Sequence, residues 1–466
     1  MRLIAIYIAW LLDVLGLKRL SRAWFAKLAV PEHPPYVVYV AAKAFISRGE
    51  IEKAKSLLAG SMMRRPSVRC GRLLMHLFIR SREYDRALEV AATLCEKSPQ
   101  SPWPYLLLGD VQNFFLGCKE DAYQSYLRAL EIARSGSSGV NPLKVAYKRI
   151  CLLLKEQGNE DQLVEYLSEF LKLQASNFHD NEFVLLTRGL MRQGRTDEAK
   201  EVLSLGIKAY PRSSPLRELW ETLGFGRKEE LPPVPVRGKA PPSSVRLVPV
   251  RTRLFLEGED PVQAVQDYVR DVAPGDIATL SSCVAGLMEG RIFMEGAVEP
   301  GFLARTLSRF VDQKNVPFGG AAPMSNPLSM QVLLEEIGSL RTLVAAFAGG
   351  LGKILGKKGW FYVIGGKDAG QIDDVLGSLP PYDYYVIMGP EDPCGLARRI
   401  ASALGCEAAI VDANDLGVAW AVGYSDGVDP RWLEQVMSTN PAGNQEQQTP
   451  IVLVRKVPEI EASEPR

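Results

Sequence analysis

Residues 49–66 read GEIEKAKSLLAGSMMRRP. Gly49 suits a tight turn between two helices, because glycine adopts left-handed backbone angles at no steric cost. Ala54 and Leu58 are four residues apart and therefore share one face of the helix that follows the turn. Pro66 ends this helix, because its ring and its missing N–H disrupt helical hydrogen bonding. The segment predicts the second helix of a helical hairpin.

The same pattern recurs through the first half of the chain. Its small or apolar position falls at Ala54, Ala87, Ala122, Leu163 and Ala199, and the packing position four residues later falls at Leu58, Ala91, Tyr126, Leu167 and Leu203. Glycines precede four of these units (Gly49, Gly117, Gly158 and Gly194), and prolines follow three of them (Pro66, Pro99 and Pro211). Over residues 36–222 this resembles the tetratricopeptide repeat family. The resemblance implies an all-α solenoid that binds a protein or peptide partner, and a purely structural scaffold is the alternative.

Residues 1–30 form a candidate amphipathic N-terminal helix. Its apolar run from Leu3 to Leu17 is interrupted only by Asp13, and basic residues follow from Lys18. The run is shorter than the about 20 residues of a membrane-crossing helix. Two interpretations remain, namely packing on the following helices and peripheral membrane contact through residues 1–28.

The composition excludes several classes of function. With 55 Lys and Arg against 54 Asp and Glu, the net charge is +1, which does not support nucleic-acid binding through a positive field. The three histidines are His33, His76 and His179, so the second half of the chain must work without imidazole. His76 lies in an apolar run and is interpreted as an ordinary helix residue. The 7 cysteines form no C-x-x-C pair, and their odd number favours a reducing compartment such as the cytoplasm.

A proline-rich segment separates two parts of the chain that differ in the periodicity of their apolar residues. The sequence KEELPPVPVRGKAPPSS, which begins at Lys228, predicts an extended linker at residues 225–245. Beyond it, β-like runs occur at 245–255, 276–280, 360–364, 384–388, 408–411 and 451–454, and helical stretches at 261–272, 302–312, 328–337, 395–404 and 432–437. The pattern predicts a multidomain chain in which a mixed α+β domain at residues 246–456 follows the solenoid, with a tail at 457–466.

Acidic and amide side chains follow one of these strands. Asp412, Asn414 and Asp415 come directly after the apolar run 408–411. Their oxygen atoms suit a hard cation such as Mg²⁺ or Mn²⁺, so these residues are candidate metal ligands. An Asx turn or a helix cap is the equally weighted alternative, because Asp and Asn are also favoured there.

Two further segments are candidates for binding phosphate groups. Residues 349–359 read GGLGKILGKKG, and Lys353, Lys357 and Lys358 could surround an anion together with backbone amides. The spacing does not match a Walker A loop, and a solvated basic turn is the alternative. In Glu289-Gly290-Arg291 the guanidinium group could fork onto a phosphate or a carboxylate, whereas a surface salt bridge is the alternative.

Taken together, residues 246–455 resemble the coenzyme F-420:L-glutamate ligase family, also called gamma-glutamyl ligases. The matching segments are Glu257-Gly258-Glu259-Asp260, Pro274-Gly275-Asp276-Ile277, Glu289-Gly290-Arg291, Pro390-Glu391-Asp392-Pro393, Ala397-Arg398-Arg399-Ile400 and the acidic residues 412–417. The resemblance implies a GTP- and metal-dependent ligase that joins glutamate to its substrate, and a homodimer. It also implies a metal at Asp412, Asn414 and Asp415, and a nucleotide or phosphate at Glu289 and Arg291.

The chain departs from this family at two positions. The ligases carry two lysines just upstream of Glu-Gly-Arg, and the matching residues here are Cys283 and Leu287. Two functions are therefore kept. The first is an amide-forming ligase that is recruited to its partner by the repeats. The second is a non-catalytic adaptor or regulator whose degenerate ligase domain binds an anionic small molecule or nucleotide.

Overall fold

The computed structural model describes residues 2–46, 48–135, 140–174, 178–211, 213–232, 242, 244–311, 323–354, 360–366, 372–375, 379–414, 417–443 and 447–456. The expected tail at 457–466 and most of the proline-rich segment lie outside these residues. The rest divides into two compact units. Unit 1 takes the described residues within Met1–Val90, Arg237–Gln313 and Ala322–Arg466, and unit 2 those within Ala91–Val236.

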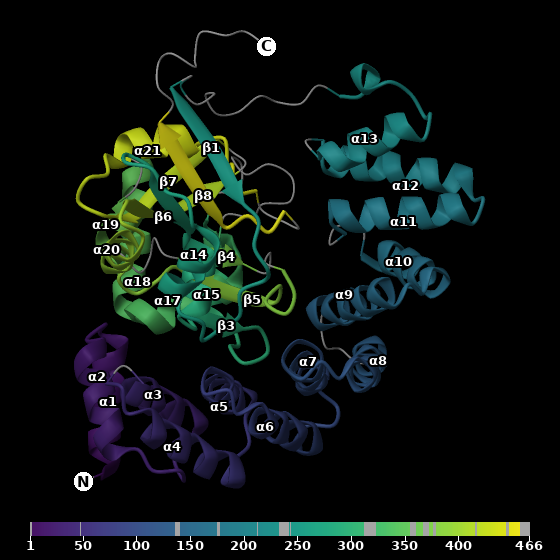
Figure 1. The fold of residues 1–466 in the computed structure, drawn as a ribbon. Helices are drawn as coiled ribbons and strands as arrows, with labels where there is room; N and C mark the ends of the chain where they lie inside the picture. Colours follow the sequence, from purple (N-terminus) through teal and green to yellow (C-terminus); the bar gives the residue numbers. More distant parts are fainter. Residues whose placement is uncertain are drawn as a thin grey trace. The chain divides into compact units, whose positions relative to one another are not determined.

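The first half of the chain is entirely helical (Figure 1). Unit 1 contains α1 (Arg2–Val14), α2 (Lys18–Leu28), α3 (Pro35–Ile46), α4 (Ile51–Arg64) and α5 (Val68–Arg80). Helix α6 (Tyr84–Lys97) runs from unit 1 into unit 2. Unit 2 continues with α7 (Pro102–Asp110), a π-helical turn (Val111–Phe115), α8 (Lys119–Ser135), α9 (Val140–Gln157), α10 (Glu160–Gln174), α11 (Asp180–Arg192), α12 (Thr196–Ala209), α13 (Ser214–Thr222) and a 3-10 turn (Lys228–Glu230).

The predicted helical repeat is confirmed by these hairpins. The four turn glycines all have left-handed backbone angles, with φ between 70° and 74°. The recurring alanines are completely buried, and the packing residues four positions later, such as Leu58 and Tyr126, are buried as well. Pro66, Pro99 and Pro211 each stand two residues after the end of a helix. Small residues allow helices to approach closely, as at Gly109, where an added Cβ would lie 2.4 Å from the ring of Tyr126.

A buried polar network lies within the core of unit 2. Arg149 on α9 is completely buried, and its Nε donates to Oδ1 of Asp110 at 2.7 Å. The hydroxyl group of Tyr126 donates to the same oxygen at 2.8 Å. The three residues come from α7, α8 and α9, so the network joins these helices. Removing one charged partner would leave the other charge buried, which is costly.

The second half of the chain is built around two sheets. The helices are α14 (Pro261–Tyr268), α15 (Ser282–Met288), α16 (Phe302–Ser308), α17 (Pro327–Ile337), α18 (Ser339–Ile354), α19 (Trp360–Gly365), α20 (Pro393–Leu404) and α21 (Pro430–Met437), and a 3-10 turn covers Pro323–Ser325. The strands are β1 (Val245–Val250), β2 (Ile277–Ser281), β3 (Ile292–Met294), β4 (Ile372–Val375), β5 (Tyr385–Met388), β6 (Glu407–Asn414), β7 (Val418–Tyr424) and β8 (Ile451–Lys456).

The larger sheet has the strand order β1-β8-β2-β6-β7, in which only β2 and β6 pair in parallel. Alternate residues of its strands enter two cores, as expected for a period of two. Leu280 and Ile410 pack with α14 and α20, whereas Val411 and Val452 pack with α21. The smaller sheet, β3-β5-β4, is antiparallel and packs against α16 and α17. The predicted mixed α+β architecture is thus present in the second half of the chain.

One predicted strand is wrong. Residues 360–364 were expected to form a strand, because they combine aromatic and β-branched side chains, but they form helix α19. This helix packs against α18, where an added Cβ on Gly349 would lie 3.1 Å from Cβ of Phe361. Tertiary packing therefore overrides the local β propensity of this segment.

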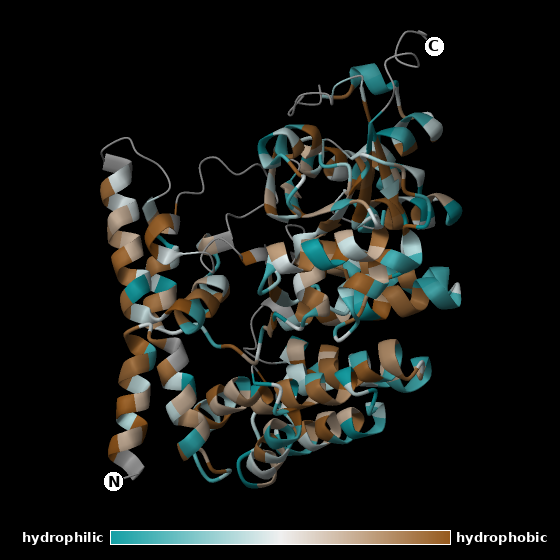
Figure 2. Ribbon diagram, turned by 60° about the vertical axis from the view of Figure 1, so that its left-hand side comes forward, coloured by the Kyte–Doolittle hydropathy of each residue, from teal (hydrophilic) through white to brown (hydrophobic). Residues whose placement is uncertain are grey.

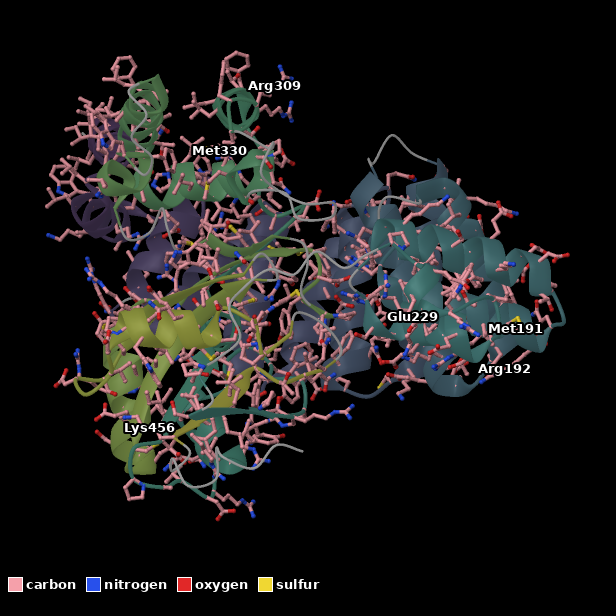
Figure 3. All side chains as sticks on the ribbon, turned by 90° about the horizontal axis from the view of Figure 1, so that it is seen from above. Met191, Arg192, Glu229, Arg309, Met330 and Lys456 are labelled. Atoms are coloured by element: carbon pink, nitrogen blue, oxygen red, sulfur yellow. The ribbon has the colours of Figure 1, made fainter. Side chains whose placement is uncertain are left out.

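The N-terminal helices contact the second half of the chain within unit 1. Arg69 on α5 donates to both carboxylate oxygens of Glu335 on α17, at 3.1 and 3.2 Å. The neighbouring Glu336 accepts from Arg22 of α2 at 3.4 Å and from Lys43 of α3. Figure 3 shows the side chains and labels the buried Met330 of α17 and the exposed Arg309. Charged contacts between distant segments thus fix α2, α3 and α5 to α17.

The N-terminal segment forms two helices instead of one, with a turn at Gly16 (φ 79°). Ala9 and Phe25 face inward and are completely buried, whereas Trp10 and Trp24 remain exposed. Within the described ranges, none of the helices combines the length and the apolar character needed to cross a membrane.

Candidate functional site

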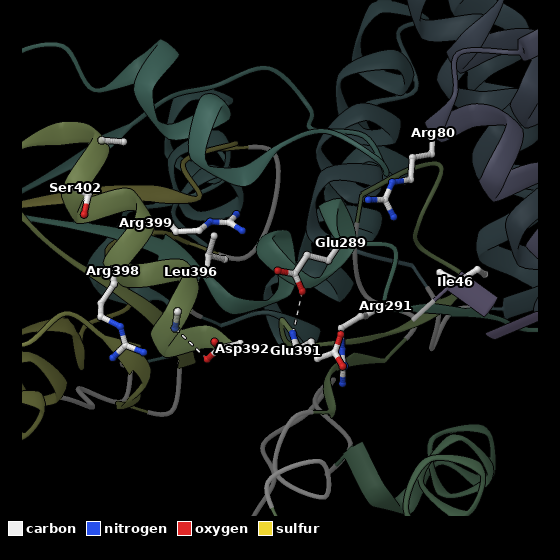
Figure 4. Close-up of a pocket in the computed structure, with 12 residues that line it drawn as sticks. Ile46, Arg80, Glu289, Arg291, Glu391, Asp392, Leu396, Arg398, Arg399 and Ser402 are labelled. Carbon is white, nitrogen blue, oxygen red and sulfur yellow. Dashed lines mark hydrogen bonds between the residues drawn. The ribbon is translucent and has the colours of Figure 1, made fainter. Parts of the chain in front are cut away.

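A pocket of about 1050 Å³ in unit 1 brings several of the matching segments together (Figure 4). Its charged lining consists of four arginines and three acidic residues: Arg80, Arg291, Arg398, Arg399, Glu289, Glu391 and Asp392. The Glu-Gly-Arg, Pro-Glu-Asp-Pro and Ala-Arg-Arg-Ile segments each contribute side chains to it. In Figure 4, Arg399 and Arg80 reach toward Glu289 from opposite sides. The excess of guanidinium groups makes the pocket suited to an anion.

Close backbone packing positions the Glu-Gly-Arg segment. Helix α15 ends at Met288, and Gly290 (φ 73°) turns the chain so that Arg291 N donates to the carbonyl of Gly286 at 2.9 Å. The carbonyl of Arg291 in turn accepts from Met388 N at 2.9 Å. An added Cβ on Gly290 would lie 2.3 Å from Cε1 of His76, so only glycine fits at this turn.

A hydrogen bond joins this segment to the Pro-Glu-Asp-Pro segment. Glu391 N donates to Oε2 of Glu289 at 2.9 Å. Burial raises the pKa of Glu289, although this hydrogen bond and the charge of Arg291 act in the opposite direction. A carboxyl group that gains a proton more readily opposes a bound anion less. Glu289 is therefore better suited to position the loop than to repel a phosphate.

Helix α20 presents two arginines to the pocket. Asp392 caps the helix, and its Oδ1 accepts from Gly395 N at 3.0 Å. Arg398 and Arg399 are more than half exposed, and their ion pairs with Asp426 and Asp260 are long, at 3.9 Å each. Such long pairs at the surface contribute little free energy. Both guanidinium groups can therefore turn toward a ligand at low cost.

The fourth arginine comes from the helical half of the chain. Arg80 is the last residue of α5, and an added Cβ on Gly258 (φ 84°) would lie 3.0 Å from its Cα. One helical turn before it, Nδ1 of His76 lies 2.7 Å from Oε2 of Glu257. Arg72 donates to both oxygens of the same carboxylate at 3.0 and 2.9 Å. Helix α5 is thus fastened to the Glu257-Gly258 loop directly beside the pocket.

Two tyrosines complete the buried cluster around Glu257. The hydroxyl group of Tyr382 accepts from Glu257 N at 2.9 Å, and that of Tyr385 accepts from Nε of Arg72 at 2.7 Å. Burial alone would raise the pKa of Glu257, but the charges and hydrogen bonds of Arg72 and His76 outweigh it and lower the pKa to about 2. Burial beside Glu257 raises the pKa of Tyr382 well above its ordinary value. The cluster therefore holds an ionised Glu257 and a neutral Tyr382 at neutral pH.

The predicted phosphate residues are only partly brought together. Glu289 and Arg291 both line the pocket. The backbone of Lys353 lies in the last turn of α18, but its side chain is outside the described part of the structure. Lys357 and Lys358 lie outside the described residues altogether. Arg80, Arg398 and Arg399 were not predicted as ligand contacts. The Ala-Arg-Arg-Ile match was a signal for two of them, but no local pattern could have indicated Arg80.

Two of the three predicted metal ligands, Asp412 and Asn414, lie in a strand and not in a loop. Strand β6 continues through Asn414, with Asp412 opposite Trp420 and Asn414 opposite Val418 of β7. Both side chains lie on one side of the strand, and Oδ1 of Asn414 accepts from Val418 N at 3.4 Å. Asp415 lies outside the described residues. Among the described residues, no group of three His, Cys, Asp or Glu side chains is suited to hold a metal ion. One carboxylate and one amide suit a Mg²⁺ ion only if ligand phosphates and water complete its shell, so the Mg²⁺ or Mn²⁺ site stays a prediction.

Comparison with known proteins does not identify a family for this chain. No protein-family model matches it, and no curated protein matches it either. Among solved structures, one crystal structure of MamA is 15% identical and covers 36% of this chain and 92% of its own, with a TM-score of 0.29. A second crystal structure of MamA is 17% identical over 42% of this chain and 97% of its own, with a TM-score of 0.30. MamA 41-end from Desulfovibrio magneticus RS-1 is 13% identical over 38% and 96%, also at 0.30. At these values the likeness carries no functional argument, and the helical repeat rests on the hairpins themselves.

Proposed function

We propose that unit 1 binds a small molecule with phosphate groups in the arginine pocket, as the anion-binding part of a repeat-containing adaptor or regulator. The observation that carries this proposal is that Arg80, Arg291, Arg398 and Arg399 line one pocket. A guanidinium group binds phosphate through two parallel hydrogen bonds, each charge-assisted. The loosely paired arginines of α20 are the adaptable part, and Arg291, held by its backbone, is the fixed part.

A nucleoside triphosphate such as GTP is the first ligand to test. Three segments that match the ligase family line the pocket, which supports a nucleotide over an unrelated anion. Thermal unfolding of the full chain should be recorded with GTP, GDP, pyrophosphate and glutamate, each with and without Mn²⁺. A ligand at 100 times its Kd stabilises the folded state by about 2.7 kcal/mol, which is a readily measured shift. Absence of a shift with every phosphate compound would refute the proposal.

Catalysis is the second candidate function, because the same three segments carry the ligase resemblance. In such a reaction a substrate carboxylate oxygen attacks the γ-phosphorus of GTP, and GDP leaves. The amine nitrogen of glutamate then attacks the acyl carbon, loses a proton and displaces phosphate. The residues that replace the family's lysines are Cys283 and Leu287, neither of which carries a positive charge. The adaptor is favoured for this reason, and glutamate-dependent release of phosphate from GTP by the full chain would overturn that preference.

We assign the protein-binding role of the repeats to unit 2. In unit 1, helices α3 and α5 are already engaged by the second half of the same chain, through Lys43 with Glu336 and Arg69 with Glu335. The hairpins after residue 90 lie in the other compact unit. Crosslinking of the full chain to its bound partners, followed by mass spectrometry, should give crosslinks concentrated in residues 91–222. A concentration in residues 1–90 would contradict the assignment.

A further inference from the structure

Two helices of unit 1 expose apolar side chains in the same spacing. On α1 and the turn after it these are Ile4, Tyr7, Ile8, Leu11 and Leu15, and on α18 they are Leu340, Leu343, Val344, Phe347 and Leu351. Residues at such intervals form one continuous stripe along a helix. Tyr7 is 68% exposed and Phe347 is 76% exposed. A contiguous group of exposed apolar side chains on a protein surface marks an interaction site.

The charged side chains that are described on the two helices, Asp13 and Arg341, are engaged in hydrogen bonds within unit 1. Asp13 is the only charged residue between Leu3 and Leu17, and it is buried, accepting hydrogen bonds from Ser21 and Tyr36 at 3.1 and 2.9 Å. On α18 the only charged residue before Lys353 is Arg341, whose Nε donates to the carbonyl of Ile364 at 3.0 Å. The outer faces are thus free of acidic groups.

The two helices meet end to end and are fixed to one another. An added Cβ on Gly338 would lie 2.7 Å from Cα of Gly16, so the turn after α1 touches the turn before α18. Glu336, two residues before this contact, is bound by Arg22 and Lys43. Figure 2 shows α1 rising from the N label with apolar colour along its length, and a second apolar helix above it at the height of α18 in Figure 1. We call the two stripes together the α1–α18 face.

We propose that the α1–α18 face lies in the headgroup region of a bilayer that contains anionic lipids. The helices have 13 and 16 residues, shorter than the about 20 needed to cross a bilayer, and lying in its surface buries their apolar stripes. Trp10 of α1 and Trp24 of α2 are also exposed, and tryptophan favours the interface between lipid and water.

Charge complementarity selects lipid over a second copy of the chain. Residues 1–28 contain Arg2, Lys18, Arg19, Arg22 and Lys27 against the single buried acid, and α18 contains Arg341 and Lys353 with no acid. Anionic headgroups attract such basic segments. A symmetric dimer through this face would instead bring two basic segments together.

Flotation of the full chain with vesicles tests the proposal. Vesicles of phosphatidylcholine with about a third phosphatidylglycerol should carry the protein to the top of the gradient, and pure phosphatidylcholine should carry at least tenfold less. The double variant Tyr7→Asp/Phe347→Asp should lose binding to the anionic vesicles at least tenfold. Met63→Asp is the matched control, because Met63 is 89% exposed on α4, and it should bind as the wild type does. Equal binding by the double variant, or no flotation of the wild type, would overturn the proposal.

Two further measurements guard against misfolding and dimerisation. In the wild type, brominated lipids in the anionic vesicles should quench tryptophan fluorescence, and Trp10→Phe/Trp24→Phe should remove most of this quenching. Unchanged quenching in that variant would contradict the assigned face without relying on an acidic substitution. Sedimentation of the lipid-free protein gives the last outcome, since a dimer abolished by Tyr7→Asp/Phe347→Asp would assign the face to a second copy and refute the lipid proposal.

Discussion

The guanidinium group of Arg72 holds both carboxylate oxygens of Glu257, at 3.0 and 2.9 Å, although 185 residues separate the two in the chain. Both side chains are nearly inaccessible to solvent. The pair joins a helix of the repeat region to the loop that borders the arginine pocket. The geometry of the pocket therefore depends on the docking of α5.

Breaking this pair should destabilise unit 1 strongly. Glu257→Ala leaves the buried guanidinium group of Arg72 without its carboxylate, and the expected loss is about 3 to 5 kcal/mol. Urea unfolding followed by tryptophan fluorescence measures it. Arg253→Ala is the matched control in the same loop, because Arg253 pairs with Glu259 at the surface and should cost about 1 kcal/mol or less. Equal losses in the two variants would mean that the buried pair does not hold α5 in place.

The docking should also depend on pH. The pKa values of Glu257 and Glu336 are about 2 in the folded chain, against an ordinary value of 4.5. A carboxyl group whose pKa is lowered by folding stabilises the fold fully above its unfolded pKa and loses that contribution as the pH falls toward its folded pKa. Each group should contribute on the order of 3 kcal/mol, lost between about pH 4.5 and pH 2.

Denaturant titrations at pH 6, 4, 3 and 2 check this expectation. The stability of the wild type should fall across the acidic range, and Glu257→Gln should show a shallower fall because its amide does not titrate. A variant curve parallel to that of the wild type would assign the acid sensitivity to other carboxyl groups. Glu336→Gln provides an independent second case, since its partners are Lys43 and Arg22.

Gly290 should be intolerant of any side chain. Its φ of 73° is unfavourable for alanine, and an added Cβ would also lie 2.3 Å from the ring of His76. Gly405 has almost the same φ, 72°, but open space around it. Gly405→Ala should therefore cost about 1 to 2 kcal/mol from the backbone alone, and Gly290→Ala should cost more. Comparison of their unfolding midpoints isolates the contribution of the contact, and equal midpoints would refute it.

The network of Arg149 should dominate the stability of unit 2. Asp110→Ala removes the carboxylate that pairs with the fully buried guanidinium group of Arg149. This loss should cost about 3 to 5 kcal/mol of folding free energy. Tyr126→Phe removes only one hydrogen bond to the same carboxylate and should cost about 1 kcal/mol. Hydrogen exchange of α7, α8 and α9 separates this unit from the rest of the chain. Stronger exchange in Tyr126→Phe than in Asp110→Ala would contradict the assigned order.

The sequence could predict those features that depend on neighbours along the chain. The turn at Gly49 and the buried face of Ala54 and Leu58 repeat at helical spacing, so local periodicity suffices to identify the hairpins. Strands such as β2 and β8 were visible as apolar runs. Residues 360–364 were misassigned, because packing between α18 and α19 decides their conformation and local propensity does not.

The candidate site was only partly predictable for the same reason. Glu289 and Arg291 stood out through a short motif, but Arg80 enters the pocket because α5 docks on Glu257 through Arg72 and His76. No local pattern in the sequence relates α5 to that loop, because the contact forms only in the folded chain. The α1–α18 face could likewise not be predicted from the sequence, because its two stripes are brought together by the contact between Gly16 and Gly338.

Calorimetric titration of the full chain with pyrophosphate tests the central claim, that the four arginines form an anion site. Arg291→Ala and Arg399→Ala should each weaken binding about 10- to 100-fold, because a hydrogen bond to a charged group contributes about 1.5 to 3 kcal/mol. Arg309→Ala removes an exposed arginine outside the pocket and should leave the affinity unchanged. Binding that is lost in the two pocket variants and kept in the control is the predicted result. No binding by the wild type, or equal affinity in all three variants, would contradict it.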